Sequence, residues 1–223
     1  MHYRVKNHDI NSQNAAKPHS QTSKQVVKEL SIIKAKSILD LGCGKLRYSD
    51  YLYKISENIC FSDSKLQLER LQKIKGEHST VKEYVAQNYP SSKCVPIEDI
   101  QKVKDTYDLI FCSNVLSAIP CEITLNKTML IIYNLLSDSG KALIVNQHRS
   151  SYFKKFEAGE PHLHGYLYEG KRGSSYYGII DKATIEGLAE KQGFSIDAFV
   201  KGDQTFAFLT KHIGVKTRRK YAA

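Results

Sequence analysis

The chain has 223 residues, a mass of 25.3 kDa, 41% hydrophobic residues and 25% charged residues. This length allows one sizeable hydrophobic core and excludes two ordinary domains joined by a linker. The composition is typical of a soluble globular protein, and no run approaches the roughly 18 consecutive apolar residues of a membrane-spanning helix. Because the first residues also lack the apolar core of a signal peptide, we expect a cytoplasmic protein with no membrane partner.

The net charge of +10 is concentrated at the two ends of the chain. Residues 1–36 hold seven Lys or Arg and two acidic residues, residues 211–223 hold five basic residues and no acid, and residues 37–210 are neutral. We therefore divide the chain into a basic N-terminal segment with a cap helix, a central domain and a basic C-terminal tail. Either these ends are solvated segments that keep the protein soluble, or they attract a polyanion such as nucleic acid.

The cysteines favour free thiols over disulfides or a zinc site. None of them forms a Cys-x-x-Cys pair, and three lie inside apolar runs. Buried thiols in a reducing compartment explain such a distribution. The five positions are Cys43, Cys60, Cys94, Cys112 and Cys121.

Helical and strand patterns alternate in the first third of the chain. Apolar residues either recur at helical spacing or form short runs bounded by polar residues and glycine, as in parallel strands covered on both faces. In chain order, the pattern predicts a helix over 22–33, a strand over 37–41, a helix from about Tyr48, a strand over 58–62 and a helix over 65–74.

The alternation continues to the end of the domain, with one ambiguous stretch. Residues 77–105 fit either a helix over 81–87 followed by a strand near 94–97, or a strand over 81–86. The remaining predicted elements are a strand over 107–112, a helix over 122–136, a turn at 137–140, a strand over 141–146, a helix over 181–192 closed by Gly193, and two hairpin strands over 194–200 and 205–210. Strand–helix alternation implies βαβ units and a parallel α/β sheet with helices on both faces, here finished by an antiparallel hairpin.

The string Ser37-Ile-Leu-Asp-Leu-Gly-Cys-Gly44 indicates a ligand site. Glycines directly after a strand permit a tight turn with backbone close to a ligand, and the helix that follows points its N–H groups at a negatively charged moiety. Asp63 lies about twenty residues further on, just beyond the second strand, at the spacing at which a carboxylate accepts from ribose hydroxyls. The alternative role for Asp63 is a helix N-cap, which Ser64 could share.

Four blocks in the chain are similar to one known family. They are SILDLGCG (37–44), FSDSKLQLERL (61–71), IEDI (97–100) before YDLIFCSNVLSAIP (107–120), and LLSDSGKALIVN (135–146). Taken together, in this order and spacing, they resemble the class I S-adenosylmethionine-dependent methyltransferases over roughly residues 25–210. The resemblance implies a Rossmann-like, mostly parallel seven-stranded sheet and S-adenosylmethionine as the cofactor and partner.

The resemblance also assigns roles around the cofactor. Its methionine part would be surrounded by Asp40, Gly42 and Gly44, with Asn114 on the floor below the sulfonium. For the nucleoside part, the resemblance implies that Asp63 holds the ribose hydroxyls. It also implies that Glu98 or Asp99 lies near the adenine, with Ile100 against the face of the ring.

One position departs from the family pattern. Many members have a third glycine two residues after the second, and this chain has Leu46 there. The neighbouring cations Lys45 and Arg47 either pair with the carboxylate of the cofactor or face solvent.

Residues 147–178 form the acceptor-side insertion that the resemblance implies, and they contain three histidines and five tyrosines. An imidazole titrates near neutral pH, so the histidines are candidate general bases, and tyrosines can stack on a planar acceptor. The candidates are His148, His162 and His164 as bases, and Tyr152, Tyr166 and Tyr168 as substrate-binding residues. The alternative is that they are ordinary surface residues, and no metal site is predicted.

The class of the acceptor stays open at this point. The chain has neither the Asn-Pro-Pro-aromatic string that DNA amino-methyltransferases carry nor the Pro-Cys nucleophile of C5-cytosine enzymes. The sequence therefore predicts an S-adenosylmethionine-dependent methyltransferase acting on a small molecule or a nucleic acid. The alternative is a non-catalytic nucleic-acid-binding or regulatory protein that retains the fold.

Overall fold

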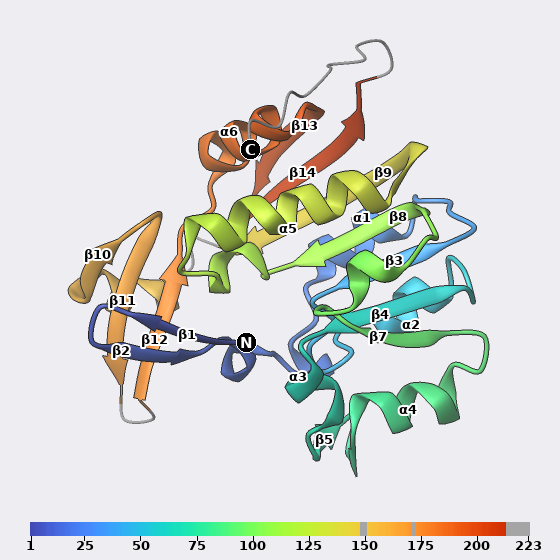
Figure 1. Cartoon of the computed structure of the whole chain (residues 1–223), viewed down its shortest axis with the longest axis horizontal. Coiled ribbons are helices and arrows are strands. Elements are labelled where there is room, and N and C mark those ends of the chain that lie inside the picture. The colour runs from blue at the N-terminus through green and yellow to red at the C-terminus, as the bar shows by residue number, and fades with distance from the viewer. Residues whose placement is uncertain (148–150, 171–172, 213–223) are drawn as a thin grey trace.

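The computed structural model describes residues 1–147, 151–170 and 173–212 (Figure 1). Its centre is a seven-stranded sheet in which the five strands from β9 to β7 are parallel, while β14 runs antiparallel to both of its neighbours. In spatial order the strands are β13 (Phe194–Lys201), β14 (Gln204–Lys211), β9 (Leu136–Gln147), β8 (Tyr107–Ser113), β3 (Ile38–Leu41), β4 (Ile59–Asp63) and β7 (Lys93–Pro96). This is the predicted Rossmann-like α/β fold with its C-terminal hairpin.

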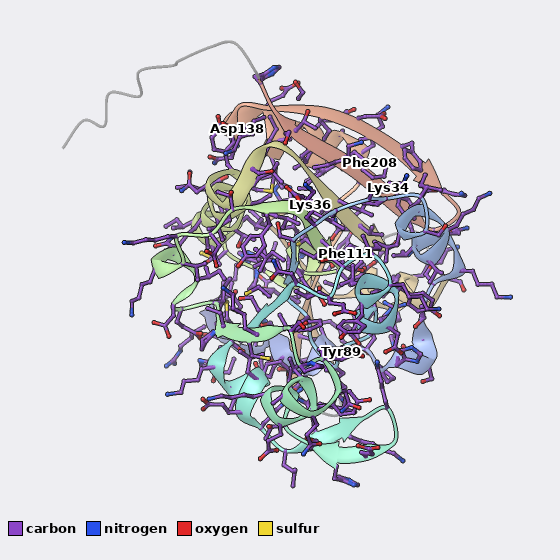
Figure 2. The ribbon with its side chains drawn as sticks, turned by 90° about the vertical axis from the view of Figure 1, so that its right-hand side faces the viewer. Lys34, Lys36, Tyr89, Phe111, Asp138 and Phe208 are labelled. Carbon is purple, nitrogen blue, oxygen red and sulfur yellow. The ribbon has the colours of Figure 1, made fainter. Side chains whose placement is uncertain are left out.

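Helices cover both faces of the sheet, so the inner strands are buried on each side. The helices are α1 (Lys24–Leu30), α2 (Ser49–Tyr53), α3 (Lys65–Glu69), α4 (Val81–Asn88), α5 (Glu122–Leu135) and α6 (Lys182–Gln192). Side chains of α5 and α6 form one core cluster with Ile110 and Cys112 of β8, and side chains of α1, α2 and α4 form the other with Leu109 and Phe111. Successive residues of β8 therefore face opposite layers, as the two-residue period of a strand requires. Figure 2 shows Phe111 near the centre of the molecule.

A small lobe built mainly from strands stands beside the main sheet (Figure 1). It combines the N-terminal hairpin, β1 (His2–Val5) and β2 (His8–Asn11), with a three-stranded sheet of β10 (Glu160–His162), β11 (Gly165–Gly170) and β12 (Gly173–Gly178). Ile10 packs on Leu167 and Tyr176, so the two ends of the domain share a third core cluster. The arrowhead of β8 points toward this lobe, which places the lobe at the carboxyl ends of the parallel strands.

Most predicted elements are confirmed, with shifted ends. The stretch 77–105 holds α4 and β7, which is the first of its two predicted patterns. The helix α6 begins after Asp181, whose carboxylate accepts from Thr184 N at 2.9 Å, and ends at Gly193 with φ +80°. A backbone in this left-handed region favours glycine, which is why the helix stops there.

The helix predicted over 65–74 is wrong beyond Glu69. After α3 the chain forms a second small hairpin of β5 (Gln72–Ile74) and β6 (Glu77–Ser79). The two residues of its loop, Lys75 and Gly76, both have positive φ, which suits a two-residue hairpin turn. The apolar residues at 71 and 74 have helical spacing, but the hairpin turn overrides that local signal.

The predicted turn at 137–140 lies inside β9. Tyr107 pairs with Leu136, whereas Leu109 already pairs with Lys141, so the pairing shifts register across these residues. Gly140 is needed at this shift because a Cβ there would lie 2.8 Å from the carbonyl oxygen of Tyr107. All five cysteines are free thiols, as predicted. Within the described part of the chain, no helix combines the length and the apolar character needed to cross a membrane.

The capping box of α4 gives a test of how this helix is held. Thr80 Oγ1 accepts from Glu83 N at 3.1 Å, and the Glu83 carboxylate accepts from Thr80 N at 3.1 Å. Replacing Thr80 by Ala should lower the free energy of unfolding by about 1 kcal/mol, measured by urea denaturation. Thr80→Ser keeps the hydroxyl and should lose much less, so equal losses in both variants would contradict this account.

Candidate active site at the ends of the parallel strands

A cavity opens at the carboxyl ends of β3, β4 and β8. In the sheet, β4 lies on one side of β3 and β8 lies on the other. The chain runs from β3 to β4 and later returns to β8, so the direction in which strands are added to the sheet reverses at β3. Open α/β sheets bind ligands in the crevice at such a switch point. The position of the cavity therefore follows from the topology, and most of the residues that line it come from the ends of these three strands, the loops after them and the N-terminal segment.

The glycine turn after β3 forms one wall of the cavity. Gly42 has φ +78° and Gly44 has φ +56°, conformations that suit glycine. A Cβ on Gly42 would lie 2.2 Å from Cγ2 of Val115, so a side chain does not fit there. The amides of Gly42 and Cys43 both donate to the carbonyl oxygen of Ser62, at 2.7 and 3.0 Å, which fastens the turn to the neighbouring strand β4.

Asp63, at the end of β4, joins this turn through its side chain. Its Oδ2 accepts from Gly44 N at 2.9 Å, and its Oδ1 accepts from Ser64 N at 2.7 Å. Burial raises the pKa of Asp63, and these two backbone amides act in the opposite direction. The capping role belongs to Ser64, whose hydroxyl accepts from Gln67 N at the start of α3. Asp63 lines the cavity beside the glycine turn, and its ribose-binding role stays a prediction.

A second carboxyl group lies in the same cavity. Asp40, in β3, is only 4% exposed and lines the cavity. Burial raises the pKa of Asp40 to about 8, and the charge of Asp63 adds to the shift. At neutral pH the side chain is therefore largely protonated, and a cationic group placed beside it would favour the ionised form.

Leu46, at the position where many members of the family have a third glycine, has a left-handed backbone. Its φ is +56°, and its side chain is fully buried in the core cluster under α1, α2 and α4. The left-handed conformation costs a non-glycine residue about 1–2 kcal/mol, and burial of the leucine side chain offsets that cost. Leu46 does not line the cavity, so this departure from the family pattern leaves the cavity open.

Asn114 also has a left-handed backbone, with φ +58°. Its amide donates to the carbonyl oxygen of Val145 at 2.7 Å, which holds the end of β8 against β9. Asn114 and Ser113 line the cavity, and the position of Asn114 below the sulfonium stays a prediction.

The three residues predicted near the adenine make contacts outside the cavity. The carboxylate of Glu98 accepts from Lys65 N at 3.1 Å, Asp99 pairs with Lys102 at 2.6 Å, and Ile100 is fully buried in the core. None of these three lines the cavity, whereas Ile97 does. Ile97 N donates to the carbonyl oxygen of Asp63 at 2.8 Å, so it continues the ladder between β7 and β4 to the cavity edge. The position of Ile97 directly after a parallel strand is the sequence signal that could have identified it as a cavity residue.

The two predicted bases that the structure describes do not line the cavity. His148 lies outside the described residues. Nε2 of His162 is 2.8 Å from the carbonyl oxygen of Pro120, and His164 lies in the two-residue turn between β10 and β11. Because Leu163 in this turn has φ +49°, the two histidines do not share one strand face. Neither lines the cavity, and their catalytic role stays a prediction.

The predicted substrate tyrosines belong to the small lobe. Tyr166 pairs with Tyr177 across β11 and β12, and the ring of Tyr168 meets that of Phe156 at a centroid distance of 5.1 Å. Tyr166 and Tyr168 do not line the cavity, and the side chain of Tyr152 lies outside the described residues. Their substrate-binding role also stays a prediction. No group of three or more His, Cys, Asp or Glu in the described residues is arranged to hold a metal ion.

An open α/β sheet with a glycine turn after its first strand and an acid after its second is the arrangement in which such proteins bind nucleosides. A family model for the methyltransferase domain matches residues 14–198. The uncharacterized protein YmfD of Escherichia coli K12 is 44% identical over 197 residues, which cover 88% of this chain and 89% of that protein. The chain belongs to the class I methyltransferase family.

Solved structures agree with this assignment at the level of the fold. The complex of DhpI with SAH is similar with a TM-score of 0.56 and 10% identity, over 79% of this chain and 76% of that one. A TehB-like SAM-dependent methyltransferase from Corynebacterium glutamicum is similar with a TM-score of 0.52 and 20% identity, over 86% and 90% of the two chains. The seven-stranded sheet is thus that of known methyltransferases.

The titration of Asp40 gives a test of the cavity's electrostatics. The folded-state pKa is raised above the ordinary value of 3.8, so the stabilisation from this group is complete near pH 4 and is lost as the pH rises through about 8. Asp40→Asn should therefore gain stability relative to the unsubstituted protein as the pH rises from 5 to 8, by at most about 1.4 kcal/mol per pH unit. Urea denaturation at several pH values measures this difference, and a difference that does not change with pH would refute it.

Proposed function

We propose that the protein is an enzyme that transfers a methyl group from S-adenosylmethionine to an acceptor in this cavity. The observation that carries the proposal is the pairing of Asp63 with the glycine turn, because it puts a carboxylate beside backbone that has no side chains. The residues present fit the cofactor, because carboxyl groups, the glycine turn and the apolar side chains of Ile97 and Ile119 line one cavity.

Each part of the cofactor would have a partner in this chain, its carboxylate included, since Lys45 and Arg47 both line the cavity. Asp63 would accept from the ribose hydroxyls, and Ile97 with Ile119 would pack on the adenine, since both line the cavity beyond β7 and β8. Asp40 and Gly42 would surround the amino acid part, where the buried carboxyl of Asp40 favours a cationic amino group. When bound, the cofactor supplies a methyl group that is already activated on a sulfonium.

The remaining tasks of the protein are to align the acceptor and to exclude water. Met1 and Tyr3 line the cavity, so the N-terminal hairpin forms part of its cover. The same hairpin packs on β11 and β12 of the insertion through Ile10. The insertion and the N-terminal segment would thus enclose the acceptor together, as the resemblance to the family implies for the acceptor side.

Binding of S-adenosylhomocysteine, the demethylated cofactor, tests the role of Asp63. Isothermal titration should show binding to the unsubstituted protein and a loss of at least about a hundredfold in affinity for Asp63→Ala, since charge-assisted hydrogen bonds contribute about 1.5–3 kcal/mol each. The matched control is Asp138→Asn, which removes one charge from a side chain that is 96% exposed. No binding to the unsubstituted protein would reject the proposed function.

The same titration should report ionisation of Asp40. At pH 7 a carboxyl with a pKa of about 8 holds about 0.9 proton, and a bound amino group would displace most of it. The binding enthalpy should therefore differ between phosphate and Tris buffers, which take up protons with different enthalpies. Asp40→Asn should abolish that difference while retaining some affinity, and equal enthalpies in both buffers would argue against this contact.

A further inference from the structure

Part of the N-terminal segment lies along the cavity between two histidines. Five residues of the range 12–17, which we call the cover segment, line the cavity. Ala16 of the cover segment lies against the glycine turn, since a Cβ built on Gly44 would be 3.3 Å from the Cβ of Ala16. His8 comes before the cover segment in the chain and His19 comes after it. Whatever holds these two histidines therefore also holds the cover segment at both of its ends.

His8, in β2, lies between two carboxylates of the insertion. Its Nε2 is 3.6 Å from Oε2 of Glu160 in β10, and its Nδ1 is 3.8 Å from Oε1 of Glu169 in β11. The same Nδ1 is 3.2 Å from the hydroxyl of Ser174 in β12, which donates to Glu169. A hydrogen bond from Lys6, in the turn of the N-terminal hairpin, lowers the pKa of Glu160, and the hydrogen bond and charge of His8 act in the same direction. Because the side chain of His8 is only 19% exposed, water screens these contacts in part.

His19 makes a second contact of this kind, with a helix of the main domain. Its Nε2 is 3.3 Å from Oδ2 of Asp50 in α2, and its ring stacks on that of Tyr51 at a centroid distance of 6.3 Å. The other carboxylate oxygen of Asp50 accepts from Lys75 and, at 2.6 Å, from the hydroxyl of Tyr89. Burial opposes the ionisation of Asp50, but these hydrogen bonds and the charges of Lys75 and His19 outweigh it and lower the pKa. Asp50 is therefore ionised at neutral pH and attracts a protonated imidazole.

Arginine side chains hold the same part of the chain independently of pH. Arg70 donates to the carbonyl oxygen of Gln13 at 3.0 Å, and Arg47 donates to that of Gln21. A guanidinium stays protonated throughout the physiological range. An imidazole, by contrast, gains or loses its proton between about pH 5 and 8. The contacts of the two histidines are thus the ones whose strength changes near neutral pH.

We propose that the N-terminal segment is a proton-dependent cover of the cavity, fastened by His8 to the insertion and by His19 to α2. At about pH 6 the protonated rings pair with ionised carboxylates, and the cover segment is held against the glycine turn. At about pH 8 the neutral rings lose this ionic attraction, so the cover segment opens more often and a ligand in the cavity exchanges faster. The opening does not depend on which ligand the cavity binds, whereas its effect on S-adenosylhomocysteine rests on the proposed function.

Hydrogen exchange of the free protein, followed by mass spectrometry on peptides that contain residues 12–17, tests this cover. After division by the intrinsic exchange rates at each pH, the protection should be about tenfold higher at pH 6 than at pH 8, which corresponds to two ion pairs of modest strength. His8→Gln and His19→Gln should each lower this ratio about threefold, and the double variant should abolish it. Asp40 titrates over the same range in every variant, so comparison among the variants cancels its contribution.

The matched control is His2→Gln. Nε2 of His2 is 3.3 Å from Oδ1 of Asp9, a contact inside the N-terminal hairpin that does not connect the segment to the rest of the molecule. This variant should keep the full ratio. A second readout is the dissociation rate of S-adenosylhomocysteine, measured by stopped flow. The double variant of His8 and His19 should speed dissociation about tenfold at pH 6 and leave it nearly unchanged at pH 8.

Three results would overturn the inference. The protection of residues 12–17 is the same at pH 6 and pH 8 in the unsubstituted protein; or the double variant keeps the unsubstituted ratio; or His2→Gln lowers the ratio as much as His8→Gln, which would show a general effect of charge. If S-adenosylhomocysteine does not bind at all, the proposed function fails, and the hydrogen-exchange comparison on the free protein still decides whether the two histidines fasten the cover segment.

Discussion

The hydrogen bond from Gly44 N to Asp63 Oδ2 is the constraint on which the cavity depends. It connects the end of β4 to the turn after β3, and the amides of Gly42 and Cys43 reinforce the connection through Ser62. The turn must then take left-handed conformations at residues 42, 44 and 46. Two of these positions are glycine, and the third is a leucine whose burial offsets its backbone strain. The turn is therefore held by backbone hydrogen bonds on one side and by the hydrophobic core on the other.

Charges of both signs line the cavity around this turn. Asp40 and Asp63 come from strands in the middle of the sheet, and Lys17, Lys45 and Arg47 line the same cavity. Arg47 donates to the carbonyl oxygen of Gln21, and Ser23 of the same segment donates to Gln204 of β14. A ligand that carries both cationic and anionic groups therefore finds complementary charges within one cavity.

Local signals explain what could be predicted from the sequence. Apolar runs bounded by glycine identify β3, β4 and β8, and the glycine turn with Asp63 follows from the same residues. The hairpin of β5 and β6 was missed because Leu71 and Ile74 have helical spacing. Lys17, which also lines the cavity, carries no local signature that distinguishes it from an ordinary surface residue. Such residues are placed by contacts between distant segments, such as that of residues 21–23 with β14.

The N-terminal segment links the cavity to the small lobe. Met1, Tyr3 and Lys17 line the cavity, while Ile10, on the same segment, packs on Leu167 and Tyr176 of the insertion. Tyr3 and Val5 of the hairpin pack against the same small core. Tyr3 also lines the cavity, so one side chain contributes both to the core of the lobe and to the cavity wall. Because this core is small, a ligand in the cavity that contacts Tyr3 would also stabilise the packing of the hairpin on the lobe.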